Sequence, residues 1–182
     1  MVHPVSFARG SAIAILGFAA VTAGAFAQNE VTQEITSGQL SASVEDADLT
    51  TIAYSNVAGS TSGTLALTVD DSRGIGTGWS VSISSSDFIY DDTSPIGLDI
   101  PNTGFNTTGF GTLVVNAGQA APAPSVGAGG TFSSDVTILS AVDASGSGNY
   151  TQAFGVSLDI PAQSQAGTYL ATLTVTIAPD AP

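Results

Sequence analysis

Apolar and polar residues alternate along four segments of the chain, and this period of two constrains the fold more than any other feature. The segments span residues 65–69, 79–83, 154–160 and 171–177, with mostly small or hydroxyl-bearing residues between the apolar positions. Because successive side chains of a strand point to opposite faces, each segment predicts a strand with one buried face. Shorter strands are expected at residues 40–44, 49–54, 113–115 and 131–139.

Segments rich in Gly, Ser or Pro separate the expected strands and predict turns. They lie at residues 59–63, 73–78, 101–111 and 144–148, and a longer surface loop is expected at about 117–130. No amphipathic helix is evident after residue 27. Short strands at this spacing predict an all-β chain with one antiparallel β-sandwich or barrel-like domain over residues 28–182. Its first residues, 28–39, are expected to be a loose tail or an edge strand.

The first 27 residues predict a cleaved secretory signal peptide. Arg9 precedes an apolar run of about 15 residues, and Ala25 and Ala27 occupy the positions expected at a cleavage site before Gln28. The run is shorter than the ~20 residues that span a bilayer, so a membrane-spanning protein is not expected. The C-terminal residues 177–182 show no signal for a lipid anchor or a covalent wall attachment. We therefore expect a secreted protein.

Charge and cysteine content exclude several classes of partner. The chain has 15 acidic residues against two arginines and one histidine, giving a formal net charge of −13, and it has no cysteine. After removal of the leader, Arg73 is the only basic residue. So acidic a chain repels nucleic acid, and without thiols it forms neither disulfides nor thiolate metal sites.

The mature chain lacks the side chains on which most enzymes depend. It has no His, Lys or Cys, so no serine has a histidine to accept its proton. Paired carboxylates remain at Asp70–Asp71, at Asp91–Asp92 and in the cluster Glu45, Asp46 and Asp48, but adjacent strand residues point to opposite faces and make a poor acid pair. We expect no enzyme and no cofactor, with calcium at these acids as a weak alternative. The glycines of residues 74–78 lead into a strand and not a helix, which argues against nucleotide binding.

The only tryptophan follows the only mature arginine across a glycine-rich turn. Asp70 and Asp71 end one expected strand, Arg73 follows them, and Trp79 begins the next strand. We expect Arg73 to pair with Asp70 or Asp71 and thereby fix the turn, with Trp79 largely shielded from water. These four residues and Tyr169 are the candidate binding residues, with Trp79 and Tyr169 as the expected contact surface for a ligand.

Two ordered half-motifs resemble the WxL domain of Gram-positive surface proteins. The first runs from Asp71 through Arg73-Gly74 to Trp79-Ser80-Val81, with Val in place of Leu. The second comprises the run 156–162 and Ala166-Gly167-Thr168-Tyr169, and it continues to 177 with Val175 where the family has its second tryptophan. The resemblance implies a non-catalytic domain that associates noncovalently with peptidoglycan at the cell surface, together with other surface proteins.

One alternative function fits the same composition. The chain can instead be a structural subunit of an extracellular filament or matrix. In that case its N-terminal segment, with Val31, Ile35, Leu40 and Val44, would add a strand to a neighbour's sheet. A secreted hydrolase that uses two aspartates is a remote third possibility.

Overall fold

The computed structural model describes residues 33–90 and 99–180. The predicted signal peptide and the Asp91–Asp92 pair lie outside these residues. Contacts divide the chain into two units, Met1–Thr36 and Ser37–Pro182. The strands of the described residues all belong to the second unit, which is the subject of the following description.

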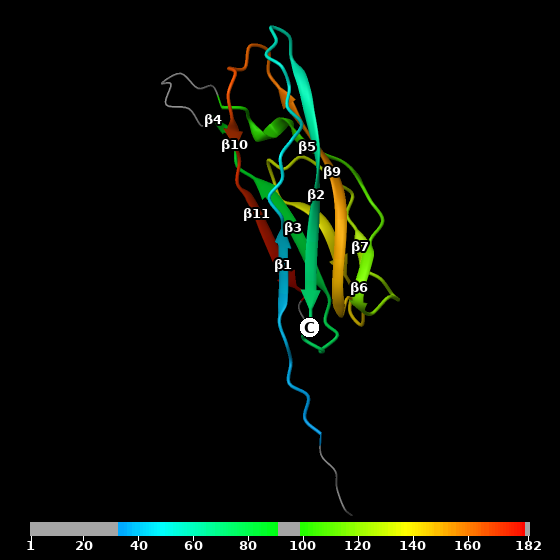
Figure 1. Ribbon diagram of the computed structural model, residues 1–182. Coiled ribbons are helices and arrows are strands. Elements are labelled where there is room, and N and C mark those ends of the chain that lie inside the picture. The colour runs from blue at the N-terminus through cyan, green and yellow to red at the C-terminus, as the bar shows by residue number, and fades with distance from the viewer. Residues whose placement is uncertain (1–32, 91–98, 181–182) are drawn as a thin grey trace, which may run out of the picture. The chain divides into compact units, whose positions relative to one another are not determined.

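The larger sheet is antiparallel and is built around two strands of 13 residues, β2 (Gly59–Asp71) and β9 (Gly148–Ile160). Strand β1 (Leu40–Val44) pairs with the outer side of β2. Strands β5 (Phe105–Phe110) and β6 (Val114–Gly118) pair one after the other with the outer side of β9. The order is therefore β1-β2-β9-β5, with β6 also beside β9 (Figure 1).

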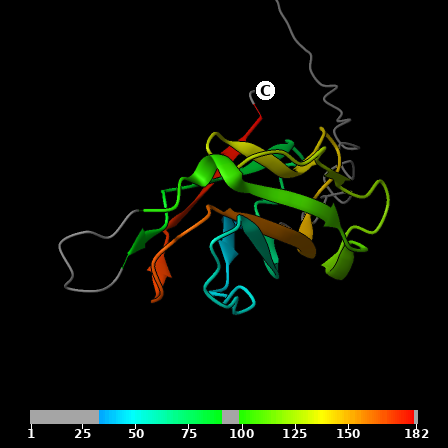
Figure 2. The same cartoon turned by 90° about the horizontal axis from the view of Figure 1, so that it is seen from above.

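The second sheet packs against the first and is also antiparallel, in the order β11-β3-β8-β7 (Figures 1 and 2). A separate two-residue ladder joins β10 to β4, and a short 3₁₀ helix, Asn102–Gly104, precedes β5. The strands are β3 (Trp79–Ser85), β4 (Ile89–Tyr90), β7 (Ser125–Val126), β8 (Val136–Ala141), β10 (Tyr169–Leu170) and β11 (Leu173–Pro179).

The core lies between the two sheets and uses the alternate positions that the sequence marks as apolar. Leu67 and Val69 of β2, Val81 and Ile83 of β3 and Val156 of β9 are all fully buried. Aromatic rings fill the rest of the interior, since Phe132 lies between Phe105 and Phe154 with centroid distances of 4.8 and 6.3 Å. The prediction of an all-β antiparallel sandwich is confirmed.

One side edge of the sandwich is joined by backbone hydrogen bonds. The Thr107 amide of β5 donates to Gly130 O at 2.9 Å, and the Phe132 amide donates to Phe105 O at 2.9 Å. The opposite edge is formed by β1 and β11, which belong to different sheets and approach to within 8 Å between Cα atoms. The two sheets are thus bridged on one side and only packed together on the other.

Several predicted boundaries differ from the structure. Residues 59–63 were expected to turn but belong to β2, because they pair with residues 156–160 of β9 and strand pairing overrides the local turn preference. Most of the expected turn at 101–111 is β5, whose ladder contains a bulge between Thr107 and Gly109.

Four further expectations also differ from the structure: two strands, one loop and the N-terminal tail or edge strand. Residues 49–54 form no regular strand, although the Thr50 amide donates to Ser62 O at 2.9 Å. The strand expected at 131–139 begins only at Val136. The short strand β7 interrupts the loop expected at 117–130. Residues 33–39, the described part of the expected tail or edge strand, carry no strand assignment.

Candidate functional site

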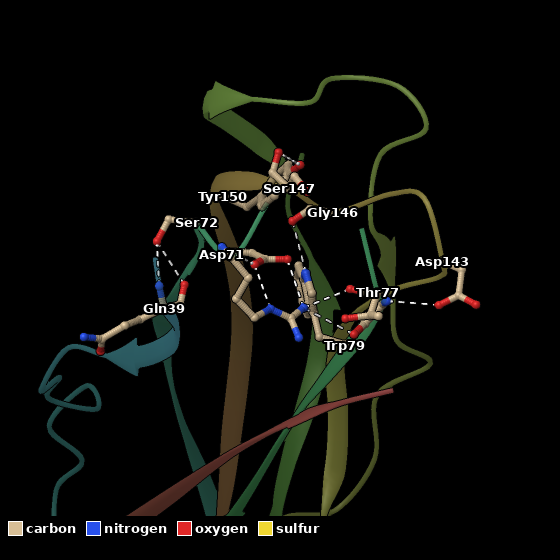
Figure 3. Close-up of polar contacts among 11 residues, drawn as sticks. Gln39, Asp71, Ser72, Thr77, Trp79, Asp143, Gly146, Ser147 and Tyr150 are labelled. Atoms are coloured by element: carbon tan, nitrogen blue, oxygen red, sulfur yellow. Dashed lines mark hydrogen bonds and ion pairs between the residues drawn. The ribbon is translucent and has the colours of Figure 1, made fainter. Parts of the chain in front are cut away.

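Arg73 is held by a carboxylate and by backbone carbonyls in the turn between β2 and β3, residues 71–79, hereafter the Arg73 turn (Figure 3). Its Nε donates to Asp71 Oδ1 at 2.9 Å and its Nη2 donates to Asp71 Oδ2 at 3.0 Å. Nη2 also donates to Thr77 O at 2.9 Å. The pair is shielded, since the Arg73 and Asp71 side chains are 12% and 2% exposed. The hydrogen bond to Asp71 and its negative charge raise the pKa of Arg73 against the opposing effect of burial.

Trp79 follows this turn and is fully buried at the start of β3. Its Nε1 donates to Gly146 O at 3.1 Å, so the polar atom of the indole is satisfied inside the core. Gly146 has a φ of 82°, and a Cβ there would lie 2.7 Å from Trp79 Nε1. Only glycine allows the loop to approach the ring so closely. The prediction that Trp79 is shielded from water is confirmed.

Tyr150 of β9 completes the shielded end of the sandwich. Its ring lies 6.2 Å from that of Trp79, and its hydroxyl donates to Gln119 O at 2.7 Å. The same hydroxyl also lies 3.2 Å from Ser147 O (Figure 3). Burial and the negative charge of Asp71 raise the pKa of Tyr150. No motif in the sequence identifies Tyr150, because its partners come from segments that are distant in the chain.

The structure separates the five candidate residues. Asp71, Arg73 and Trp79 come together in and beside the Arg73 turn. Asp70 points to the other face of β2, where the Asn149 side chain donates to it at 3.4 Å. Tyr169 lies beyond the opposite end of the sandwich. The fully buried ring of Trp79 offers no surface to a ligand, because the strand position that shields it also removes it from solvent.

A cleft of about 980 Å³ opens at the Tyr169 end, hereafter the cleft. Residues 44–55, at and after the end of β1, form one bank, and residues 164–173, before and at the start of β11, form the other. Buried core side chains line it, among them Leu158 of β9 and the bridged pair Phe88 and Ile100. The cleft therefore leads from the surface to the hydrophobic core.

Tyr169 is fixed at the cleft by its neighbours. Its ring packs 5.1 Å from that of Tyr90, and its hydroxyl donates to Gln165 O at 2.9 Å. Burial and the charge of Asp99 raise the pKa of Tyr169, although the hydrogen bond at Gln165 acts in the opposite direction. The Tyr90 hydroxyl donates to Ala166 O at 3.0 Å, and a Cβ at Gly167 would lie 2.5 Å from the Tyr90 ring. The close approach of the Tyr90 ring explains why a glycine occupies position 167.

The polar groups around the cleft are carboxylates and hydroxyls. Glu45, Asp46 and Asp48 are exposed beside Thr50 and Thr51 on the bank that follows β1. Across residues 33–90 and 99–180, no group of three or more His, Cys, Asp or Glu side chains is placed to hold a metal ion. These side chains offer hydrogen bonds from the hydroxyls and negative charge from the carboxylates.

The two half-motifs of the sequence lie on neighbouring strands. Val81 of β3 pairs directly with Ile177 of β11, and Val175 pairs with Ile83. Val175 also lines the cleft, so the position of the missing second tryptophan faces that space.

Comparison with protein families identifies the family to which the chain belongs. In the described part of the chain, no helix is both long and apolar enough to cross a membrane. A search of curated proteins found no match. A family model described as "WxL domain surface cell wall-binding" matches residues 19–182. The chain therefore belongs to the WxL domain family of surface proteins that bind the cell wall.

Proposed function

We propose that this protein is a non-catalytic domain that binds peptidoglycan through uncharged contacts. The proposal rests on the hydrogen bonds that already occupy the Arg73 guanidinium. It is the only basic residue among those that the structure describes, and its guanidinium is already bonded to Asp71 and Thr77. No cation in this part of the chain is left to attract an anionic polymer. Hydrogen bonding and apolar contact must then supply the attachment.

The cleft offers the surface best suited to such contacts. Tyr169 and Tyr54 both line it, and the Tyr54 side chain is 59% exposed. Aromatic rings beside hydroxyls present apolar faces and hydrogen-bonding groups together, as sugar rings and peptide groups require. We assign the contact with the wall to this mouth of the cleft, and we assign to Trp79 the role of fixing the Arg73 turn.

We also propose that other surface proteins bind this domain and that the domain catalyses no reaction. The filament alternative has less support, because Leu40 and Val44 already belong to β1 in their own sheet. Ile35 is 89% exposed and remains available for such a contact, whereas Val31 lies outside the described residues. A monomer that sediments with purified wall supports wall binding, and fibres that form without wall support the alternative.

Substitution at the cleft tests the site. Tyr169→Ala combined with Tyr54→Ala is expected to weaken retention on purified peptidoglycan roughly tenfold, since about 1.4 kcal/mol of lost contact gives that factor. Ile75→Ala is the matched control, because Ile75 is 61% exposed but lies in the Arg73 turn at the other end of the sandwich. Equal retention of all three proteins would exclude the cleft. Release of soluble wall fragments during incubation would contradict the non-catalytic role.

A further inference from the structure

The outer edge of β11 carries backbone groups without a strand partner. Among the described strands, β11 is the end strand of its sheet and pairs only with β3. The Asp180 amide donates to Gly78 O and the Ser86 amide donates to Thr172 O, so even-numbered residues of this segment face β3. Because the direction alternates along a strand, the amides of Leu173, Val175 and Ile177 point outward.

The two ends of this edge differ. Pro179 occupies the next outward position and has no amide hydrogen, so it prevents pairing at the end near Trp79. Leu173 and Val175, at the other end, retain their amides and also line the cleft. An extended chain can therefore pair with β11 only where the cleft lies beside it.

The cleft fits the side chains of such a strand. Alternate residues of an added strand would point toward the sandwich interior, where Phe88, Ile100 and Leu158 present apolar surface. Every second residue of the occupant is therefore expected to be apolar. This pattern is the same one that the domain's own strands use to bury one face.

The negative charge of the bank opposite β11 favours one kind of bound chain over another. Glu45, Asp46 and Asp48 are exposed across the cleft from β11, and no described basic side chain lies there to offset them. A second copy of this chain carries a formal net charge of −13 and would be repelled. A segment with lysine or arginine beside its apolar residues is electrostatically complementary.

We propose that the edge of β11 at Leu173–Val175, together with the cleft, binds an extended basic segment of another polypeptide by strand addition. The segment pairs with the outward amides, inserts alternate apolar side chains into the cleft and places its cations against the acidic bank. This inference adds a second ligand to the cleft proposed above for wall binding. The wall contact is at Tyr54 and Tyr169, whereas the peptide contact is at the strand edge.

A synthetic peptide of alternating valine and threonine between terminal lysines tests the proposal. In titration calorimetry with the mature protein, it is expected to bind roughly tenfold or more tightly than the same peptide with terminal glutamates. Hydrogen exchange at the Leu173 and Val175 amides should slow when the lysine peptide is bound. Absence of binding, equal binding of the two peptides, or unchanged exchange at these amides would overturn the proposal.

Val175→Trp places a large side chain in the part of the cleft beside β11, and Ile177→Trp is its matched control. Both residues lie on the same face of β11, but only Val175 lines the cleft. V175W is expected to abolish peptide binding, whereas I177W should retain it. The variant with Tyr169→Ala and Tyr54→Ala separates the two proposals, because it should lose wall retention and still bind the lysine peptide at the strand edge.

Neutralising the acidic bank provides a test that does not alter the core. A variant with Glu45→Gln, Asp46→Asn and Asp48→Asn changes only exposed side chains, so it remains informative if V175W does not fold. It should lose the preference for the lysine peptide over the glutamate peptide. Retention of the full preference would contradict the assigned role of the acidic bank.

Discussion

Replacing Arg73 by alanine removes the guanidinium that neutralises Asp71 and bridges the turn into Trp79. The substitution deletes two charge-assisted hydrogen bonds to the carboxylate and two to backbone carbonyls, Thr77 O at 2.9 Å and Gly78 O at 3.4 Å. The Asp71 side chain is 2% exposed, and the donor that remains near it is the amide of residue 73, at 3.1 Å. The variant therefore leaves an almost unpartnered charge inside the protein.

The size of the effect follows from that burial. An exposed ion pair contributes under about 1 kcal/mol, whereas breaking a buried pair from one side costs about 3–5 kcal/mol. The Arg73 side chain is 12% exposed, so water can reach the vacated space and replace part of the lost bonding. We expect the free energy of unfolding to fall by about 3 kcal/mol, near the lower end of the buried range.

Chemical denaturation followed by Trp79 fluorescence measures this change, and neighbouring acids provide controls. Asp70→Asn should cost less than about 0.5 kcal/mol, because Asp70 makes only a 3.4 Å contact on the other face of β2. Adding Asp71→Asn to the Arg73→Ala variant should restore part of the stability by removing the unpartnered charge. An unchanged denaturation midpoint for Arg73→Ala would refute the reasoning.

Three further predictions concern burial, pH and close packing. Trp79 is the only tryptophan, so native fluorescence should peak well below the wavelength of hydrated indole; a hydrated maximum would contradict its burial. The raised pKa of Tyr150 means that its contribution to stability is complete below pH 10.0 and is lost as pH rises through the folded value. The free energy of unfolding should therefore fall less steeply with rising pH in Tyr150→Phe than in the unchanged protein. An equal slope would show that Tyr150 is not the cause of the fall. Gly127→Ala should destabilise by more than about 2 kcal/mol, because a Cβ there would overlap the Thr137 carbonyl, whereas Gly130→Ala meets only ordinary contacts. Equal denaturation midpoints for these two variants would contradict that packing.

The parts of the fold that the sequence predicts are those encoded locally. The alternation at residues 65–69 and 79–83 depends only on neighbouring residues, and both segments are strands with the expected buried face. Alternation also explains why Arg73 pairs with Asp71 and not Asp70, since only Asp71 points toward the shielded side of β2. The sequence does not predict strand β5, because the glycines of residues 101–111 favour turns and only pairing with the distant β9 makes residues 105–110 extended.

The candidate site was predicted less well, for a physical reason. The cleft is formed by segments as far apart as residues 44–55 and 164–173, and no sequence pattern links them. Trp79 and Tyr169 were grouped because both are aromatic residues in the half-motifs. The pairing of β3 with β11 instead places Trp79 at one end of the second sheet, and Tyr169 lies beyond the other end in the β10–β4 ladder. Spacing within a motif could not reveal that separation.

Retention of the mature protein on purified peptidoglycan across a salt series tests uncharged binding most directly. The engaged state of Arg73 and the acidic surface predict that added salt leaves retention unchanged or increases it, because salt screens repulsion between like charges. A chelator should have no effect if calcium does not bridge the acidic side chains to the wall. Loss of retention at moderate salt, or on addition of chelator, would contradict attachment through hydrogen bonds and apolar contacts.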